Sequence, residues 1–213
     1  MPPGRIAYNI NAPVLLLHTI QTESALDGLL STGSLLPDPA RAGTRHRDAY
    51  SWMLAQMAQR LPTAGPAALW FWAKIRREDL VDNCGFHGGQ VLLTCRIPRE
   101  RVLLSQYEAW HEVLNRVPSL QPETGEGDDA YDARYNALLD NFSRQLRDAG
   151  AFHNVMESWP AELREEVERT WQSILDPAAF PKTAYWQATT HWLRSEDVVE
   201  VVRFTDRNRP WRS

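Results

Sequence analysis

Short apolar runs alternate with amphipathic segments along the chain, without a regular strand–helix–strand repeat. Runs of continuous or alternating apolar residues predict strands at 14–20, 68–74, 90–97, 184–193 and 198–204. Apolar residues spaced three and four apart predict helices near 23–32, 48–61, 105–114, 130–149 and 161–175. Because strands and helices are mixed irregularly, the pattern predicts an α+β fold with a mixed or antiparallel sheet flanked by helices.

Local signals predict where several of these elements begin and end. Thr22 is a suitable N-cap for the first helix, and Gly33 stands where a left-handed residue usually ends a helix. The segment Ser105–Glu108 has the form of a capping box and is predicted to open the third helix. In the second helix, Met53 and Met57 are predicted to lie on one buried stripe that continues to Leu61.

Length and composition predict a single folded domain over residues 1–213, since 43% of the residues are hydrophobic and 23% are charged. We expect an irregular N-terminal arm at 1–13, an acidic loop at 119–129 and a basic tail at 205–213. The longest apolar run is too short to span a bilayer, and the first residues do not resemble a signal peptide. A cytoplasmic protein is therefore predicted, with Cys84 and Cys95 as reduced thiols.

Charge and motif spacing narrow the classes of function. The net charge of −4 argues against a general nucleic-acid surface. No two of the six histidines stand three or four residues apart, so no metal site is predicted. The segment Gly85–Gly89 lacks the Lys-Ser/Thr of a phosphate loop and is predicted to be a hairpin turn. No membrane partner is expected.

Nine tryptophans predict a Trp-rich core, with the alternative that some indoles line a pocket for a planar ligand. Trp70 and Trp72 fall on one face of their strand because the side-chain period is two. His18 is in an apolar strand, where a structural histidine and a ligand-binding one are both open interpretations. Gln187 is also in a predicted strand, and a buried glutamine needs several partners that a ligand can supply.

Five segments carry a resemblance to a known family: residues 17–21, 49–57, 70–72, 102–115 and 186–204. Together they cover the chain nearly end to end, and their aromatic residues have a distinctive spacing. On these segments the chain resembles a bacterial family known as domain of unknown function 3841. This resemblance implies kinship and no particular activity.

A fainter resemblance concerns activity. Residues 15–39 are similar to the opening of NAD-dependent ADP-ribosyltransferases, including the DNA-modifying toxin branch. In the histidine-type enzymes a strand residue there binds the NAD ribose, and His18 matches it. The segment Gln187–Thr189, followed by Asp197–Val199, is similar to their Gln-Ala-Glu and Val-Pro strand entry. Thr189 replaces the catalytic glutamate and supplies no charge, so the resemblance implies a non-standard active site.

The first hypothesis is thus a nucleotide-binding protein of ADP-ribosyltransferase-like fold, with NAD as its substrate. His18, Gln187 and Thr189 are its candidate catalytic residues, and the candidate binding residues are Gln21, Trp70, Trp72, Trp110 and His111. One alternative is a non-catalytic protein- or ligand-recognition module, which would hold a protein or peptide partner through its Trp-rich surface and the acidic loop at 119–129. The other alternative is a tailoring enzyme that acts on an unrelated small molecule.

Overall fold

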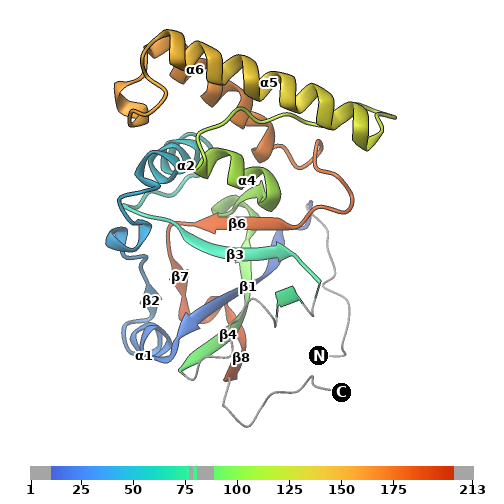
Figure 1. The fold of residues 1–213 in the computed structure, drawn as a ribbon. Helices are drawn as coiled ribbons and strands as arrows, with labels where there is room; N and C mark the ends of the chain where they lie inside the picture. Colours follow the sequence, from blue (N-terminus) through green and yellow to red (C-terminus); the bar gives the residue numbers. More distant parts are fainter. Residues whose placement is uncertain (1–10, 77–78, 81–88, 204–213) are drawn as a thin grey trace. The chain divides into compact units, whose positions relative to one another are not determined.

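The computed structural model describes residues 11–76, 79–80 and 89–203, without the side chains of residues 41 and 42 (Figure 1). The helices are α1 (Glu23–Thr32), α2 (Arg47–Arg60), α4 (Tyr107–Leu114), α5 (Asp128–Asp148) and α6 (Ala161–Thr170). The strands are β1 (Val14–Thr22), β2 (Ser34–Leu35), β3 (Leu69–Lys74), β4 (Gln90–Pro98), β5 (Leu103–Gln106), β6 (Trp186–Thr190), β7 (Leu193–Arg194) and β8 (Val198–Arg203). Short 3₁₀ helices are η1 (Pro39–Ala42), η2 (Arg99–Arg101), η3 (Met156–Ser158), η4 (Trp171–Leu175) and η5 (Ser195–Asp197).

The larger sheet has six strands in the order β5-β6-β3-β1-β4-β8, and β2 pairs separately with β7. The strand β1 is antiparallel to both β3 and β4, as β3 is to β6 and β4 to β8. The longest ladder joins β1 to β4 without a break, from Val14 opposite Pro98 to Thr22 opposite Gln90. The predicted α+β fold with an antiparallel sheet is therefore confirmed.

The ends of α1 follow the signals in the sequence. The Thr22 hydroxyl accepts a hydrogen bond from the Ala25 amide at 3.1 Å. Gly33 has a φ of 79°, and its amide donates to the Leu29 carbonyl at 2.9 Å. A side-chain N-cap of this kind stabilises a helix by about 1 kcal/mol. The predicted cap and stop of the first helix are both confirmed.

Three predicted elements differ from the structure. Ser105 is fully buried in β5, and the N-cap of α4 is Gln106 without a side-chain bond, so the predicted capping box is wrong. Pairing of residues 103–106 with β6 outweighs this local helix signal, as sheet formation commonly does. The predicted strand 184–193 is divided into β6 and β7, which belong to different sheets. The helix predicted to reach residue 175 ends at Thr170 and continues as η4.

The chain forms two compact units. The first contains residues 1–42, 53–104 and 185–213, and the second contains residues 43–52 and 105–184. The prediction of a single domain remains a prediction. Four predicted features lie wholly or mostly outside the described residues: Cys84, the turn at 85–89 apart from Gly89, most of the N-terminal arm, and the basic tail.

The core of the first unit is built on one face of the larger sheet. Odd-numbered residues of β1 and β4 supply it, among them Leu17, Val91, Leu93 and Ile97, which are at most 1% exposed. Cys95 shares this face, and burial, followed by the negative charge of Asp197, raises the pKa of its thiol to about 12. Cys95 is thus a fully buried core residue, and its thiol is held protonated.

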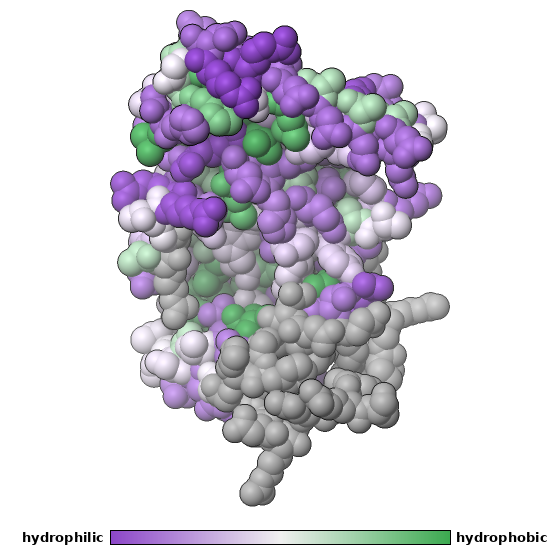
Figure 2. All heavy atoms as spheres, in the orientation of Figure 1, coloured by the Kyte–Doolittle hydropathy of each residue, from purple (hydrophilic) through white to green (hydrophobic). Residues whose placement is uncertain are grey.

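Tryptophans build the core of the second unit. Trp171 is fully buried, its ring lies edge-on to Trp52 at 5.5 Å, and its Nε1 donates to the Val117 carbonyl at 2.7 Å. Trp159 packs in the same manner on Phe142 at 5.8 Å. Figure 2 shows mainly hydrophilic side chains over α5 and α6, broken by small apolar areas. The predicted Trp-rich core is confirmed in this unit.

An arginine of the following helix bonds two parts of the acidic loop. The loop was predicted to run to residue 129, but it ends at residue 127 because α5 begins at Asp128. From α5, Arg134 bonds the Glu126 carboxylate at 2.6 Å and the Gln121 carbonyl at 3.0 Å. These bonds, made within the second unit, tie both parts of the loop to the helix that follows it.

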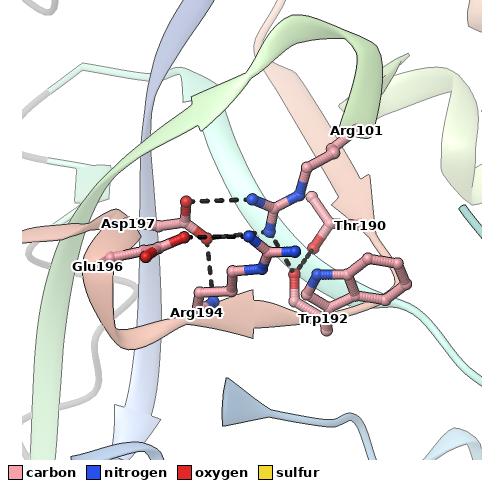
Figure 3. Close-up of polar contacts among 6 residues, drawn as sticks. All are labelled: Arg101, Thr190, Trp192, Arg194, Glu196 and Asp197. Atoms are coloured by element: carbon pink, nitrogen blue, oxygen red, sulfur yellow. Dashed lines mark hydrogen bonds and ion pairs between the residues drawn. The ribbon is translucent and has the colours of Figure 1, made fainter. Parts of the chain in front are cut away.

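A buried ion pair joins two segments of the first unit (Figure 3). Arg101, in η2, donates to both carboxylate oxygens of Asp197, at 3.1 and 2.9 Å. The same guanidinium reaches the Trp192 carbonyl at 3.5 Å, and Asp197 also accepts from the Arg194 amide at 2.9 Å. Thr190, at the end of β6, donates to the Trp192 carbonyl as well. We call this cluster the Arg101–Asp197 latch; it holds the chain where β6 ends and where β8 begins.

One half-buried carboxyl, that of Glu112, makes the second unit sensitive to pH. Burial raises the pKa of Glu112 in α4, against the smaller lowering effect of the nearby Ser119 and Tyr135 hydroxyls. The folded state therefore binds this proton more tightly than the unfolded chain. The stability that results is fully present below the unfolded pKa of 4.5 and is lost as the pH rises through the folded pKa.

We expect Glu112→Gln to abolish this loss and to raise the free energy of unfolding at neutral pH. Each unit by which burial raises the pKa corresponds to about 1.4 kcal/mol. Urea unfolding between pH 4 and pH 8 measures the effect. Glu165→Gln, which removes an exposed carboxylate of the same unit, should leave the pH profile unchanged. Equal profiles for the wild type and Glu112→Gln would contradict the assignment.

Candidate functional site

Side chains from five strands lie in one row across the sheet of the first unit. The register places His18 of β1 opposite Trp72 of β3, and Trp72 opposite Gln187 of β6. On the other side, His18 lies opposite Thr94 of β4, and Thr94 lies opposite Glu200 of β8. Directly paired residues of antiparallel strands project to the same face. All five therefore share one face, and we call them the His18 row.

The face that carries the His18 row is opposite the core face of the sheet. Along β1 and β4 the even-numbered residues project to it, and Leu16, Ile20 and Leu92 there are only half-buried. Within the row itself, His18 is 6% exposed and Thr94 is 2% exposed, whereas Glu200 is exposed. The row is thus enclosed at its centre and open at its β8 end.

A continuous chain of hydrogen bonds joins three members of the row. Nδ1 of His18 lies 3.2 Å from Oγ1 of Thr94. The Thr94 hydroxyl in turn donates to Oε2 of Glu200 at 3.1 Å. An imidazole, a hydroxyl and a carboxylate from β1, β4 and β8 are thereby linked. Such a chain can orient a histidine toward a ligand.

Gln187 has an unused acceptor at the other end of the row. Its side chain is half-buried and its Oε1 is enclosed, yet no residue in the described part of the chain donates a hydrogen bond to that oxygen. A buried carbonyl oxygen without a donor costs about 1–3 kcal/mol. A ligand that presents an N–H or O–H group would remove this cost. The placement agrees with the interpretation of Gln187 as a binding residue.

Two more predicted site residues occupy the same face, one pair further along. Trp70 lies opposite Thr189, two positions from the pairing of Trp72 with Gln187. Thr189 is fully buried, and its hydroxyl donates a long bond of 3.4 Å to the Leu103 carbonyl. The side chain at the position of the expected glutamate is therefore enclosed and uncharged.

The other predicted binding residues do not join the row. Gln21 projects from the opposite face of β1, where its Nε2 donates to the Thr19 hydroxyl at 2.9 Å. Trp110 and His111 belong to the second unit, in α4. There Trp110 is 4% exposed and packs edge-on against Tyr50 at 5.9 Å. The structure thus places His18, Trp70, Trp72, Gln187 and Thr189 on one face of the sheet.

Three polar residues of this face, Thr94, Arg96 and Glu200, were not among the predicted site residues. Thr94 interrupts the apolar strand 90–97, which is the one local signal that could have marked it. Arg96 follows two positions later, so its exposed guanidinium projects to the same face. In the part of the chain that the structure describes, no carboxylate forms an ion pair with Arg96. Arg96 therefore gives this face an exposed positive charge.

The exposure of the tryptophans concerns the hypothesis of a protein-recognition surface, and the clustering of possible metal ligands concerns a metal site. Eight of the nine tryptophans are in the described ranges, and each of them is buried or half-buried, so none offers a fully exposed anchor for a partner. Within those ranges, no three His, Cys, Asp or Glu side chains cluster in a way that could hold a metal ion. No helix within them is long and apolar enough to cross a membrane.

The fold and the row define a class: an α+β protein whose antiparallel sheet has a hydrophobic core face and a second face that carries a polar row. A more particular assignment comes from the sequence as a whole. The family model described as domain of unknown function (DUF3841) matches residues 16–199, which is well over half of the chain, and the chain belongs to this family. No curated protein and no solved structure matches the chain.

Proposed function

We propose that the chain binds a nucleotide on the face of the His18 row, and that NAD is this nucleotide. The observation that supports the proposal is that two segments distant in sequence carry their matching residues, His18 and Gln187, on one face of the sheet. The resemblance to ADP-ribosyltransferases rests on residues 15–39 and on residues 187–199, with His18 and Gln187 as matching positions. These two residues lie in one row, separated only by Trp72, so their backbones are about 10 Å apart.

The side chains of this face suit the parts of NAD. The indoles of Trp70 and Trp72 offer flat apolar surfaces for a planar ring. The imidazole of His18 and the amide of Gln187 offer hydrogen bonds to a sugar or a carboxamide. The exposed guanidinium of Arg96 offers a charge for a pyrophosphate. Aromatic, polar and cationic groups on one face fit a dinucleotide better than an uncharged metabolite.

The reaction that goes with this ligand is transfer of ADP-ribose. In it the bond between the nicotinamide nitrogen and C1′ of the ribose breaks, the electron pair leaves with nicotinamide, and a nucleophile of the acceptor bonds to C1′. A carboxylate ordinarily stabilises the cationic transition state, and Thr189 has none. The carboxylate of the row is Glu200, which lies two strands from His18. Binding of NAD is accordingly the primary proposal, and transfer depends on it.

A thermal-shift screen against NAD, ADP-ribose, nicotinamide, ATP and GTP tests the proposal. A ligand present at a hundred times its Kd, and bound only by the folded state, adds about 2.7 kcal/mol. We expect NAD and ADP-ribose to stabilise the wild type. His18→Ala and Gln187→Ala should each weaken binding by about tenfold, the effect of one lost hydrogen bond.

Gln21→Ala is the matched control, because Gln21 lies on the same strand as His18 and projects from the other face. It should bind as the wild type does. If all three variants bound NAD with equal affinity, NAD would not bind at the His18 row. A flat response to the whole panel would contradict the proposal itself.

A further inference from the structure

The direction of the hydrogen bonds in the His18–Thr94–Glu200 chain is fixed by the chemistry of its members. A threonine hydroxyl has one hydrogen, and a carboxylate can only accept. Oγ1 of Thr94 donates its hydrogen to Oε2 of Glu200. It therefore has none left for His18, and the contact of 3.2 Å must be a bond from the Nδ1–H of His18 to the Thr94 oxygen.

We infer that Glu200 is a positioning residue that acts through Thr94 to hold His18 in the Nδ1–H tautomer. The second nitrogen of the neutral imidazole, Nε2, is then an acceptor. Any partner of Nε2, a ligand included, has to donate a hydrogen. The tautomer stands on the hydrogen bonds alone. Its consequence, that this position selects a sugar hydroxyl, rests on the proposed function.

Burial strengthens the effect of this chain on the histidine. His18 and Thr94 are 6% and 2% exposed, so water competes little for their bond. The strand ladder fixes the two backbones opposite each other, which keeps the ring and the hydroxyl in register. In free histidine, by contrast, the Nε2–H tautomer is preferred. Holding the other tautomer therefore requires a specific acceptor at Nδ1, and Thr94 serves as that acceptor because Glu200 engages its own hydrogen and keeps it from donating to Nδ1.

The other two carboxylates near the start of β8, those of Asp197 and Glu196, form ion pairs with arginines. Asp197 is held by Arg101 in the Arg101–Asp197 latch. Glu196 pairs with Arg194 at 3.0 Å. Within the described residues, Glu200 is the carboxylate that accepts from Thr94. Glu196 accordingly provides a matched control: a glutamate four positions earlier, exposed, and outside the row.

The experiment is a two-bond ¹H–¹⁵N correlation of the histidine rings in the labelled full chain, recorded without ligand at pH 8, with His18 assigned by its absence in His18→Asn. In the wild type we expect Nδ1 to carry the hydrogen. In Glu200→Ala the Thr94 hydroxyl is released and can donate to Nδ1, so most of the population should change to the Nε2–H form. Glu200→Gln keeps a carbonyl acceptor and should largely retain the wild-type tautomer.

Glu196→Ala should give the wild-type spectrum. Thr94→Val, which removes the bridging hydroxyl at nearly constant volume, should release the tautomer as Glu200→Ala does. A wild-type ring in the Nε2–H form, or one that stays Nδ1–H in both Glu200→Ala and Thr94→Val, would overturn the inference. Thermal melting confirms that each variant is folded.

Binding of NAD, measured separately, distinguishes this inference from the proposed function. A change of tautomer together with an affinity for NAD about fivefold weaker supports both. A change of tautomer in a protein that never binds NAD contradicts the proposed function and leaves Glu200 as the residue that positions His18. Binding of NAD that is unaffected by a changed tautomer contradicts the selection of a sugar hydroxyl at Nε2.

Discussion

Replacing Asp197 with alanine is expected to lower the free energy of unfolding of the first unit by about 3–5 kcal/mol. The guanidinium of Arg101 is 11% exposed and the Asp197 side chain is 6% exposed, so the pair is largely removed from water. Removing the carboxylate leaves a buried charge without compensation, and it also leaves the Arg194 amide without its acceptor. Urea unfolding followed by tryptophan fluorescence measures the loss.

The same loop offers a control for this prediction. Glu196 pairs with Arg194 at 3.0 Å, but their side chains are 71% and 53% exposed. Exposed pairs of this kind contribute at most about 1 kcal/mol, so Glu196→Ala should have little effect. The double variant Arg101→Met, Asp197→Leu removes both charges and should be more stable than Asp197→Ala. Equal losses of unfolding free energy in Asp197→Ala and Glu196→Ala would show that the latch stabilises the fold no more than an exposed ion pair does.

The latch also bears on the candidate site, since Asp197 immediately precedes the strand that carries Glu200. Thr190, at the end of the strand that carries Gln187, bonds the same Trp192 carbonyl that Arg101 reaches. One ion pair thus restrains the two strands, β6 and β8, that carry the ends of the His18 row. Variants of the row should therefore be compared in a chain whose latch is intact.

How much of this could be predicted from sequence differs between the fold and the site. The strand β1 and both ends of α1 follow from residues close together in the chain: an apolar run, a threonine cap and a glycine with positive φ. Such signals depend on local backbone chemistry, and the structure follows them. Ser105 shows the limit, because its pairing partner in the sheet is distant in sequence and outweighs the capping-box pattern.

The candidate site was predictable only in part, for the same reason. A resemblance pointed to His18 and Gln187 one at a time, but their meeting depends on the strand order, which places β3 between β1 and β6. The bond between Thr94 and Glu200 requires the pairing of β4 with β8. No periodicity within either strand specifies that pairing. Residues whose role arises from a cross-strand contact are thus the ones that local patterns miss.

Replacing Trp171 with alanine is expected to destabilise the second unit by about 3–5 kcal/mol. The indole is fully buried, contacts Trp52 edge-on at 5.5 Å, and donates to the Val117 carbonyl. Trp171→Phe keeps most of the packing and loses the hydrogen bond, for which we expect about 1–3 kcal/mol. Val155→Ala, at a side chain that is 60% exposed, should change stability by less than about 0.5 kcal/mol.

Together, Trp171→Ala and Asp197→Ala test the predicted single domain, because Trp171 belongs to the second compact unit and Asp197 to the first. If the whole chain unfolds in one cooperative step, both variants lower the same transition, and fluorescence and circular dichroism follow it with one midpoint. Two transitions, each lowered by only one of the variants, would contradict the single domain. Each unit would then have its own free energy of unfolding, and stabilisation by NAD should appear only in the transition that Asp197→Ala lowers.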